Sequence, residues 1–557
     1  MDKPIRYSFM GALTKLFQLI NLEKREVGQI YFFAVLIGVI QLSLPLGIQA
    51  IVGLLFGGIL SVSLLVLITF VVVGVLVGGI IQIMQMRVTE NIQQRIFTRL
   101  TFAYAYRIPR IDLLSIDNYY LPELVNRFFD TANLQKGMAK LLLDVPTASI
   151  QILFGLLLLS FYHPAFTVFG LILLVFIFII IYGSSNRGLN SSIEESDYKY
   201  RVGHWLEEIS RAIKTFKFAQ KDQLHLKKVD ELILGYLSAR RLHFGVLVFQ
   251  YGALIAFKVL ITASMLIIGT VLFLDQKINL GQFIAAELII IAVLNSVEKL
   301  IISLETGYDV LTAIEKLDHV LQKPQDKELE SMKGSEPVHV KGFDLSVRNL
   351  GFSFPGGKKI LDGVSFELNP GEKICITGAE GSGKTTLIRI LAGLYSGYSG
   401  QILVNDMPLH NIPVDDWRSG TAVFFAQEEL FNGTLVENLT LGNAGISLAE
   451  ISETCKLVGL LPFIQSQLEG YHTKIDSQGQ KLSHSVVQKI LLARCFLRKP
   501  HILLMENGWE SIEAEHRQRI INKLVTDKTF SLIAVSELSE LSSGCDRTVR
   551  IAEGKII

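Results

Sequence analysis

The stretch Ile374-Cys-Ile-Thr-Gly-Ala-Glu-Gly-Ser-Gly-Lys-Thr-Thr386 decides the fold of the C-terminal part of this chain. An apolar run comes first, a glycine-rich turn follows it, and a helical pattern begins after the turn. This order predicts a strand, a loop and a helix. Four positions have the spacing G-x-x-x-x-G-K-[ST] of a phosphate-binding P-loop, namely Gly378, Gly383, Lys384 and Thr385.

The residues of this loop indicate its chemistry. Its glycines let backbone N–H groups point inward, and the N-terminus of the following helix adds partial positive charge. Lys384 is expected to reach the β- and γ-phosphates of a nucleotide, and the Thr385 hydroxyl to bind Mg²⁺. We therefore expect a nucleoside triphosphate with Mg²⁺ at this loop. The loop residues expected to contact the nucleotide are Gly378, Ala379, Glu380, Gly381, Ser382, Gly383, Lys384, Thr385 and Thr386.

Composition places the rest of the chain in a membrane. The 557 residues are too many for one core, half of them are hydrophobic, and the mean hydropathy is +0.41. Apolar runs long enough to cross a bilayer are confined to the first three hundred residues. The net charge of +1 and the absence of a basic tail argue against nucleic acid as a partner.

Six spans are predicted, and they come in pairs. The two long connections between pairs are rich in Lys and Arg, whereas the short connections within pairs nearly lack them. The positive-inside rule then places both long loops, both termini and the C-terminal part in the cytosol, with the spans in the plasma (inner) membrane. The predicted spans are Ile30–Phe56, Val62–Ile83, Leu143–Tyr162, Ala165–Tyr182, Phe244–Leu274 and Gly281–Ile302.

Three further features of the membrane part carry expectations. The N-terminal segment 1–28 has helical apolar spacing and predicts an amphipathic helix on the membrane surface. The turning points of the long loops, near Leu114–Tyr120 and Arg211–Gln220, are expected to touch a cytosolic domain. Ionisable residues at membrane depth are scarce, and we single out Lys258 in span five and Glu287 in span six, either as a structural pair or on a substrate path.

The order of these parts resembles that of an ATP-binding cassette (ABC) exporter of the half-transporter kind, over essentially the whole chain. The resemblance implies an α-helical six-span membrane domain of ABC exporter type plus an α/β P-loop nucleotide-binding domain. The domains expected are an N-terminal elbow helix at 1–28, a membrane domain at 29–321, a polar linker at 322–342 and a nucleotide-binding domain at 343–557.

Motifs around the loop extend the resemblance. Phe354 stands where the family stacks an aromatic ring on adenine, and a strand-edge core residue is the alternative reading. Gln427 matches the glutamine that contacts Mg²⁺ or its water. With Thr385 and Glu506, it completes the expected metal ligands, and Ser483 is expected to contact a phosphate.

Other motifs depart from the family pattern. Where the family has Leu-Ser-Gly-Gly-Gln, this chain has Leu482-Ser-His-Ser-Val486, so side chains occupy the space that glycines leave for a γ-phosphate. Glu506 replaces the aspartate that binds Mg²⁺. Asn507 replaces the glutamate that polarises the attacking water, and an amide cannot accept that proton. Val535 or Ser536 occupies the position of the H-loop histidine, and Glu513 that of the D-loop aspartate.

These departures shape the expected function. Family nucleotide domains dimerise head to tail, so each ATP lies between the P-loop of one chain and the signature of the other. We expect a half-transporter subunit that binds ATP and hydrolyses it weakly or not at all. It would move a substrate out of the cytosol, as a homodimer or as a heterodimer with a second half-transporter. A periplasmic adaptor protein is a further candidate partner. The alternative is a non-transporting, nucleotide-gated membrane regulator or scaffold. Leu44–Val52 is similar to polypeptide-secretion exporters, which suggests a peptide or protein substrate.

Overall fold

The computed structural model describes residues 8–56, 62–116, 121–219, 221, 223–326, 343–425, 427 and 430–557. The chain forms two compact units, which are described separately. The first comprises Met1–Pro109 and Tyr119–Lys323, and the second comprises Arg110–Asn118 and Pro324–Ile557. The connection expected at residues 57–61 and most of the expected linker, residues 327–342, lie outside the described residues.

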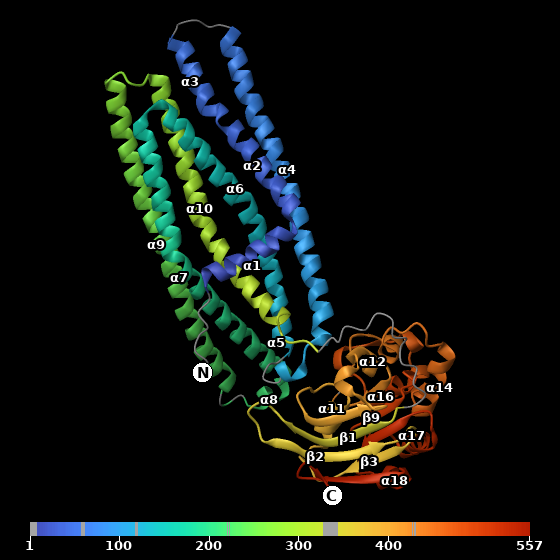
Figure 1. Cartoon of the computed structure of the whole chain (residues 1–557). Helices are drawn as coiled ribbons and strands as arrows, with labels where there is room; N and C mark the ends of the chain where they lie inside the picture. Colours follow the sequence, from blue (N-terminus) through green and yellow to red (C-terminus); the bar gives the residue numbers. More distant parts are fainter. Residues whose placement is uncertain are drawn as a thin grey trace. The chain divides into compact units, whose positions relative to one another are not determined.

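Long helices build the first unit (Figure 1). Six stretches of this unit are long and apolar enough to cross a membrane, as predicted. The helices are α1 (Phe9–Leu22), α2 (Lys24–Gln41), α3 (Ser43–Phe56), α4 (Val62–Arg107), α5 (Leu121–Asn126), α6 (Asp130–Tyr162), α7 (Pro164–Arg211), α8 (Ile213–Phe218), α9 (Leu224–Leu274) and α10 (Leu280–Leu321). Short 3₁₀ turns follow α4 at Ile108–Arg110 and precede α6 at Arg127–Phe129, and another, Leu113–Ile116, lies in the second unit.

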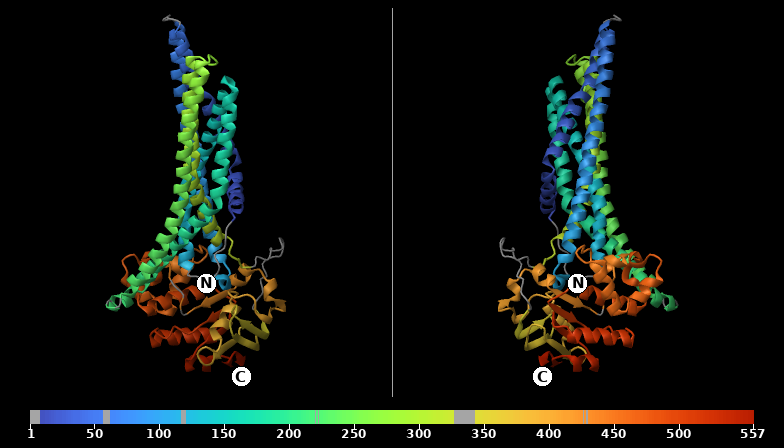
Figure 2. Two further views of the ribbon diagram at one scale, coloured as in Figure 1. Left: turned by 90° about the vertical axis from the view of Figure 1, so that its left-hand side faces the viewer. Right: turned by 90° about the vertical axis from the view of Figure 1, so that its right-hand side faces the viewer.

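Burial separates the inner from the outer helices of this unit. α6, α7, α9 and α10 lie side by side (Figures 1 and 2) and enclose a cluster that includes Leu159, Phe166, Leu173 and Ile289. By contrast, most large apolar side chains of α4 between Val62 and Met86 are exposed. An apolar surface of that length suits the hydrocarbon interior of a bilayer.

The first predicted span is divided into two helices. α2 ends at Gln41 and α3 begins at Ser43, with Leu42 between them. Pro45 lies in the first turn of α3, and proline both lacks an N–H and disfavours helical geometry in the preceding residue. The break therefore has a local cause in the sequence.

The pairing expected of the membrane-depth charges needs correction. Lys258 forms its ion pair with Glu298, not with Glu287. At 1.5 Å rise per residue, Lys258 lies about 24 Å from the end of α9 at Leu274. Glu298 lies about 27 Å from the facing start of α10, whereas Glu287 lies only about 10 Å from it. Because the two helices are antiparallel, Glu298 lies at nearly the same depth as Lys258 and Glu287 does not, so Glu298 is the partner.

The second unit contains a parallel sheet and an antiparallel sheet. The larger sheet has the strand order β12-β11-β3-β10-β9-β6, and all pairs in it are parallel except β11 with β12. The smaller sheet has the order β2-β1-β4-β5. The strands are β1 (Leu345–Ser353), β2 (Lys359–Leu368), β3 (Lys373–Thr377), β4 (Ser399–Val404), β5 (Met407–Pro408), β6 (Thr421–Phe424), β7 (Gly433–Thr434), β8 (Lys474–Ile475), β9 (Ile502–Met505), β10 (Ser531–Val535), β11 (Arg547–Ala552) and β12 (Lys555–Ile556).

Two apolar cores hold this unit together. One joins the two sheets to α11 and includes Ile374, Ile376 and Leu387. The other lies among the remaining helices and includes Leu435 and Trp509. The helices are α11 (Lys384–Leu391), α12 (Val414–Ser419), α13 (Leu435–Thr440), α14 (Leu448–Val458), α15 (Leu461–Ser466), α16 (His484–Leu497), α17 (Ala514–Thr526) and α18 (Ser539–Gly544).

The turning point of the first long loop belongs to the second unit. Leu114 packs against the core that joins the two sheets, and the Asp112 N–H donates to the Pro324 carbonyl at 2.9 Å. The contact predicted for this turning point is confirmed at Leu114, while residues 117–120 lie outside the described residues. For the turn at Arg211–Gln220, which includes α8, the contact stays a prediction.

Candidate functional site

The glycine-rich loop lies between β3 and α11, as the sequence predicts. β3 is an inner strand of the parallel sheet, between β10 and β11. Gly378, Gly381 and Gly383 all have positive φ, at 148°, 75° and 101°. A Cβ on Gly378 would lie 2.1 Å from the carbonyl oxygen of Ile551, so only glycine fits there. The turn keeps the backbone close to β11 and leaves its open side to the cavity.

Lys384 is held by the loop that it follows. Its Nζ donates to the carbonyl oxygens of Gly378 and Ala379, each at 2.7 Å. Lys384 is also the first residue of α11, whose N-terminus carries partial positive charge. The ammonium group therefore lies at the mouth of an anion-binding turn, where phosphate oxygens are the natural acceptors to replace the two carbonyls.

A cavity of about 1140 Å³ opens beside this loop and brings distant motifs together. Loop residues 380–386 line one wall. Gln427, Glu506, Asn507 and Val535 line another. The parallel sheet explains the positions of Glu506, Asn507 and Val535. Glu506 and Asn507 come directly after β9, and Val535 ends β10. The carboxyl ends of parallel strands meet at one edge, where ligands of open α/β sheets bind.

The oxygen atoms on these walls fit Mg²⁺. Among the described residues, no group of three or more His, Cys, Asp or Glu side chains is placed to hold a metal. One carboxylate (Glu506), one hydroxyl (Thr385) and one amide (Gln427) line the cavity. Mg²⁺ prefers such hard oxygen ligands and is commonly held by one or two carboxylates together with substrate phosphates and water.

Two buried oxygens are also ready for a ligand. Asn507 Oδ1 and Ser382 Oγ are buried and make no hydrogen bond within the described part of the chain. Both residues line the cavity. Since buried polar atoms in native proteins nearly always have partners, these two atoms indicate a site that a polar ligand or water completes.

Several cavity residues were not found by sequence reasoning. Arg389, five residues after Lys384 on α11, places its Nε 3.8 Å from Glu506 Oε1. Lys359 and Lys555 both pair with Asp362 at the rim and lower the pKa of that carboxyl. Arg389 had a sequence signal in its distance from the loop lysine. The rim residues had none, because β2 and β12 are nearly two hundred residues apart.

Four predicted site residues do not line the cavity, namely Gly378 and Ala379 at the start of the loop, and Phe354 and Ser483 elsewhere. Phe354 packs edge-on against Phe352 and Tyr395, with ring centroids 5.2 and 5.6 Å away, and is half-buried. Ser483 caps the N-terminus of α16, where its Oγ accepts from Val486 N at 3.4 Å. Neither residue lines the cavity. The surroundings of Phe354 are those of the alternative interpretation, a core residue at a strand edge. The phosphate contact expected of Ser483 stays a prediction.

The two candidates for the position of the H-loop histidine differ in their access to the cavity. Val535 lines the cavity, whereas Ser536 does not. Ser536 is buried, and its Oγ accepts from the Leu538 N–H at 3.1 Å. Neither side chain can donate a charged hydrogen bond to a phosphate as histidine does.

The D-loop position is tied to the signature helix within the same chain. Glu513 forms an ion pair with Lys489 of α16 at 2.5 Å, and this lysine lowers the pKa of Glu513. Ser485 Oγ donates to the same carboxylate at 3.4 Å. Trp509 is fully buried beside them in the helical core. Glu513 thus has two partners on α16 of its own chain.

Comparisons with known proteins agree with this arrangement. Residues 27–297 match the ABC transporter transmembrane region, and residues 361–509 match the ABC transporter domain. A bacterial Atm1-family ABC exporter with ATP bound has the same fold. Its TM-score is 0.85 at 17% identity, and the match covers 96% of this chain and 94% of that one.

Similar proteins of known sequence are transporters. A probable ABC transporter ATP-binding/permease protein of Haemophilus influenzae is 30% identical over 300 residues, which are 52% of each chain. The lactococcin-A transport/processing ATP-binding protein LcnC of Lactococcus lactis is 25% identical over 90% of this chain and 68% of its own. The alpha-hemolysin translocation ATP-binding protein HlyB of Escherichia coli is 28% identical over 63% of this chain and 50% of its own. The matches therefore cover about half of the Haemophilus protein and of HlyB.

One chain thus joins six helices able to span a membrane to an α/β domain with a P-loop cavity, and both parts match the models of one family. The α/β domain is a nucleotide-binding domain, and the chain is a multi-pass membrane protein. The protein belongs to the ABC transporter family and has the fold of its exporters.

Proposed function

We propose that the chain is an ABC exporter half-transporter subunit that binds ATP with Mg²⁺ and hydrolyses it weakly or not at all. The observation that carries this proposal is the composition of the cavity. The P-loop supplies the groups that would hold the phosphates, and Thr385, Gln427 and Glu506 supply oxygens for the metal, whereas Asn507 and Val535 stand where catalysis needs a base and a histidine.

The P-loop wall supports binding. In the proposal, Lys384 exchanges its bonds to Gly378 and Ala379 for bonds to the nucleotide phosphates, and backbone N–H groups of the loop hold the remaining oxygens. Thr385, Gln427 and Glu506 hold the metal. Mg²⁺, when bound there, neutralises charge on the β- and γ-phosphates.

The opposite wall supports slow turnover. Asn507 Oδ1 lies at the cavity without a hydrogen bond from the described residues, so it is free to accept from a water molecule. An amide oriented in this way positions water but does not take its proton at neutral pH. The nucleotide then acts by its binding, as a ligand that changes the conformation of the subunit.

Dimerisation, substrate and placement are parts of the proposal that the relatives support. We propose a homodimer or a heterodimer with a more active half-transporter, in the plasma (inner) membrane with the nucleotide domain in the cytosol. The proposed substrate is a peptide or protein, because LcnC and HlyB carry lactococcin-A and alpha-hemolysin in their names. The domain limits 1–28, 29–321, 322–342 and 343–557 belong to the same proposal.

Equilibrium binding of Mg²⁺-ATP to the purified full chain in lipid nanodiscs tests the nucleotide part. Wild-type protein is expected to bind, and Lys384→Ala to lose binding at least a hundredfold, because a charge-assisted contact to the phosphates is removed. Lys456→Ala, on α14 far from the cavity lining, is the matched control and should bind normally. Unchanged binding by Lys384→Ala would contradict the proposal.

Vesicle uptake separates the transporter from the regulator. The chain, together with any subunit that copurifies with it, is reconstituted in vesicles. ATP-dependent uptake of a copurifying peptide, lost in Lys384→Ala, is expected of a transporter. ATP binding without uptake of any copurifying peptide would favour the nucleotide-gated regulator instead.

A further inference from the structure

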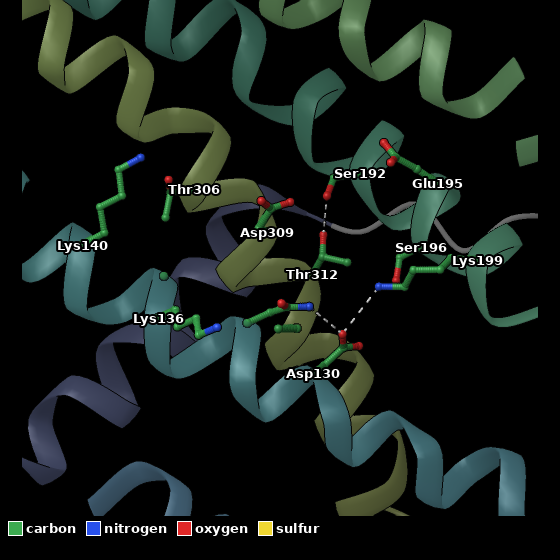
Figure 3. A pocket seen from close by; sticks show the side chains of 13 residues that line it. Asp130, Lys136, Lys140, Ser192, Glu195, Ser196, Lys199, Thr306, Asp309 and Thr312 are labelled. Carbon is green, nitrogen blue, oxygen red and sulfur yellow. Dashed lines mark hydrogen bonds and ion pairs between the residues drawn. The ribbon is translucent and has the colours of Figure 1, made fainter. Parts of the chain in front are cut away.

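The first unit contains a polar cavity that no sequence motif indicated. It has a volume of about 340 Å³ and lies between α6, α7 and α10 (Figure 3). That volume is at the small end of the range for ligand sites, which is about 300–1,000 Å³. It suits a short peptide or the end of a longer one.

Charges on one side of this cavity are already paired. Asp130 accepts from Tyr200 Oη at 2.6 Å and forms an ion pair with Lys199 at 3.7 Å. Glu195 pairs with Arg240 at 3.2 Å. Asp130 of α6 and both Glu195 and Lys199 of α7 thus already have charged or hydrogen-bonding partners.

Three other charged residues that line the cavity form no ion pair within the described part of the chain. Lys136 and Lys140, one helical turn apart on α6, form no ion pair or hydrogen bond with the described residues, and neither does Asp309 on α10. All three side chains are exposed to solvent. Figure 3 shows Asp309 between the α6 lysines and the α7 wall. Two cations and one anion are therefore available to a ligand.

Uncharged groups add hydrogen-bonding capacity next to these charges. Thr306 lies between Lys140 and Asp309 in Figure 3, and Ser192 and Thr312 hydrogen-bond to each other at 2.8 Å across the cavity. A hydroxyl both donates and accepts, so these groups suit the amides of a peptide backbone.

The depth of the cavity places it at the membrane margin. Counted from the helix ends at Tyr162, Pro164 and Leu280, the lining residues lie about 33–52 Å along α6, α7 and α10. The hydrocarbon interior is about 30 Å thick, so these residues lie beyond it. They lie toward the end of α10 that continues into the second unit, where a water-borne substrate would arrive.

We propose that this cavity binds a peptide as a zwitterion, with Lys136 and Lys140 holding its carboxylate and Asp309 holding its amino group. The inference rests on the proposed export of a peptide or protein and names the site where its charged end is recognised. Nucleotides fit less well, because no aromatic side chain lines the cavity for a base to stack on, and Asp309 repels a polyphosphate.

Calorimetric titration of the full chain in nanodiscs tests this site without any nucleotide. The probes are trialanine, its C-terminal amide, N-acetyltrialanine and O-phosphoethanolamine. The double variant Lys136→Gln/Lys140→Gln is expected to weaken trialanine binding about tenfold or more, and to bind the free acid and the amide equally. Asp309→Asn should weaken binding of trialanine but leave that of N-acetyltrialanine unchanged.

Lys227→Gln is the matched control, because Lys227 is exposed on α9 and does not line the cavity. It should bind all probes as wild type does. The proposal is overturned if wild type does not bind trialanine, if wild type binds the amide as tightly as the acid, or if the control is weakened equally. Tighter, lysine-dependent binding of O-phosphoethanolamine would assign the cavity to lipid headgroups and would also overturn it.

These outcomes are separate from those of the nucleotide site. Loss of peptide binding with intact Mg²⁺-ATP binding would contradict only the cavity proposal. Absence of ATP binding with intact, lysine-dependent trialanine binding would contradict the proposed nucleotide function and leave the peptide site in place.

Discussion

The two walls of the nucleotide cavity differ in what their residues can do. The wall built by the P-loop and α11 has glycines at positive φ, a lysine at the loop mouth and a threonine at the helix start. The wall built by the ends of β9 and β10 has an amide and an apolar side chain at the corresponding catalytic positions. The residues proposed to hold the phosphates follow β3, whereas the two altered catalytic positions lie at the ends of β9 and β10, so phosphate binding can be kept while hydrolysis is lost.

The altered wall is nonetheless well ordered. Glu506 lies 3.8 Å from Arg389, and Glu513 pairs with Lys489. Trp509 fills the helical core, and Ser483 caps α16. Glu506 and Glu513 thus have charged neighbours within their own chain.

Restoring the altered wall is expected to give the largest effect. General-base catalysis contributes about 10²–10⁴-fold, so Asn507→Glu would restore that factor if it acted alone. Catalytic groups act as a unit, and we expect the single change to recover little. A combined variant that adds Glu506→Asp, His484→Gly, Ser485→Gly, Val486→Gln and a histidine at position 535 or 536 should recover measurable phosphate release. Full recovery by Asn507→Glu alone would show that the other departures do not matter.

A substitution in the P-loop wall should damage binding without touching those groups. Gly378→Ala places a Cβ 2.1 Å from the Ile551 carbonyl oxygen, so the loop must shift. We expect Mg²⁺-ATP affinity to fall about tenfold or more. Gly397→Ala is the control, since Gly397 also has a positive φ, of 78°, meets no atom within 4 Å and does not line the cavity. Equal ATP affinity in both variants would contradict the assignment of ATP binding to the P-loop.

The smallest expected effect is a change of stability with pH, caused by a buried lysine in the strand that leads into the P-loop. Lys373 at the start of β3 is fully buried, and its Nζ donates to the carbonyls of Asp527 and Phe530. Burial lowers its pKa to about 8 from 10.5. Between these values the unfolded state binds more protons, so stability should rise with pH by roughly 1–3 kcal/mol.

Tryptophan fluorescence of the full chain can follow that unfolding, because Trp417 and Trp509 both lie in the second unit. Melting temperatures of wild type are expected to rise between about pH 8 and pH 10.5 relative to those of Lys373→Met, which carries no titrating group. Parallel pH profiles for the two proteins would refute the assigned shift.

Much of the fold could be predicted from sequence, because its signals are local. A glycine spacing predicted the loop, and apolar runs predicted the six spans. The break at Leu42 had a local signal in Pro45 but was missed. The partner of Lys258 could not be predicted, since it depends on how far each helix extends from a shared turn. Lys359 and Lys555 could not be assigned to the cavity because β2 and β12 belong to different sheets, which meet only in the folded domain.

The central claim is that this chain binds ATP without turning it over at a family-typical rate. Measuring Mg²⁺-ATP binding and phosphate release on one sample of purified wild-type chain, beside Lys384→Ala, tests it most directly. The account predicts saturable binding by wild type, none by the variant, and phosphate release near background in both. Vigorous Mg²⁺-dependent phosphate release by wild type, lost in Lys384→Ala, would contradict it and would mean that a residue other than Asn507 supplies the base.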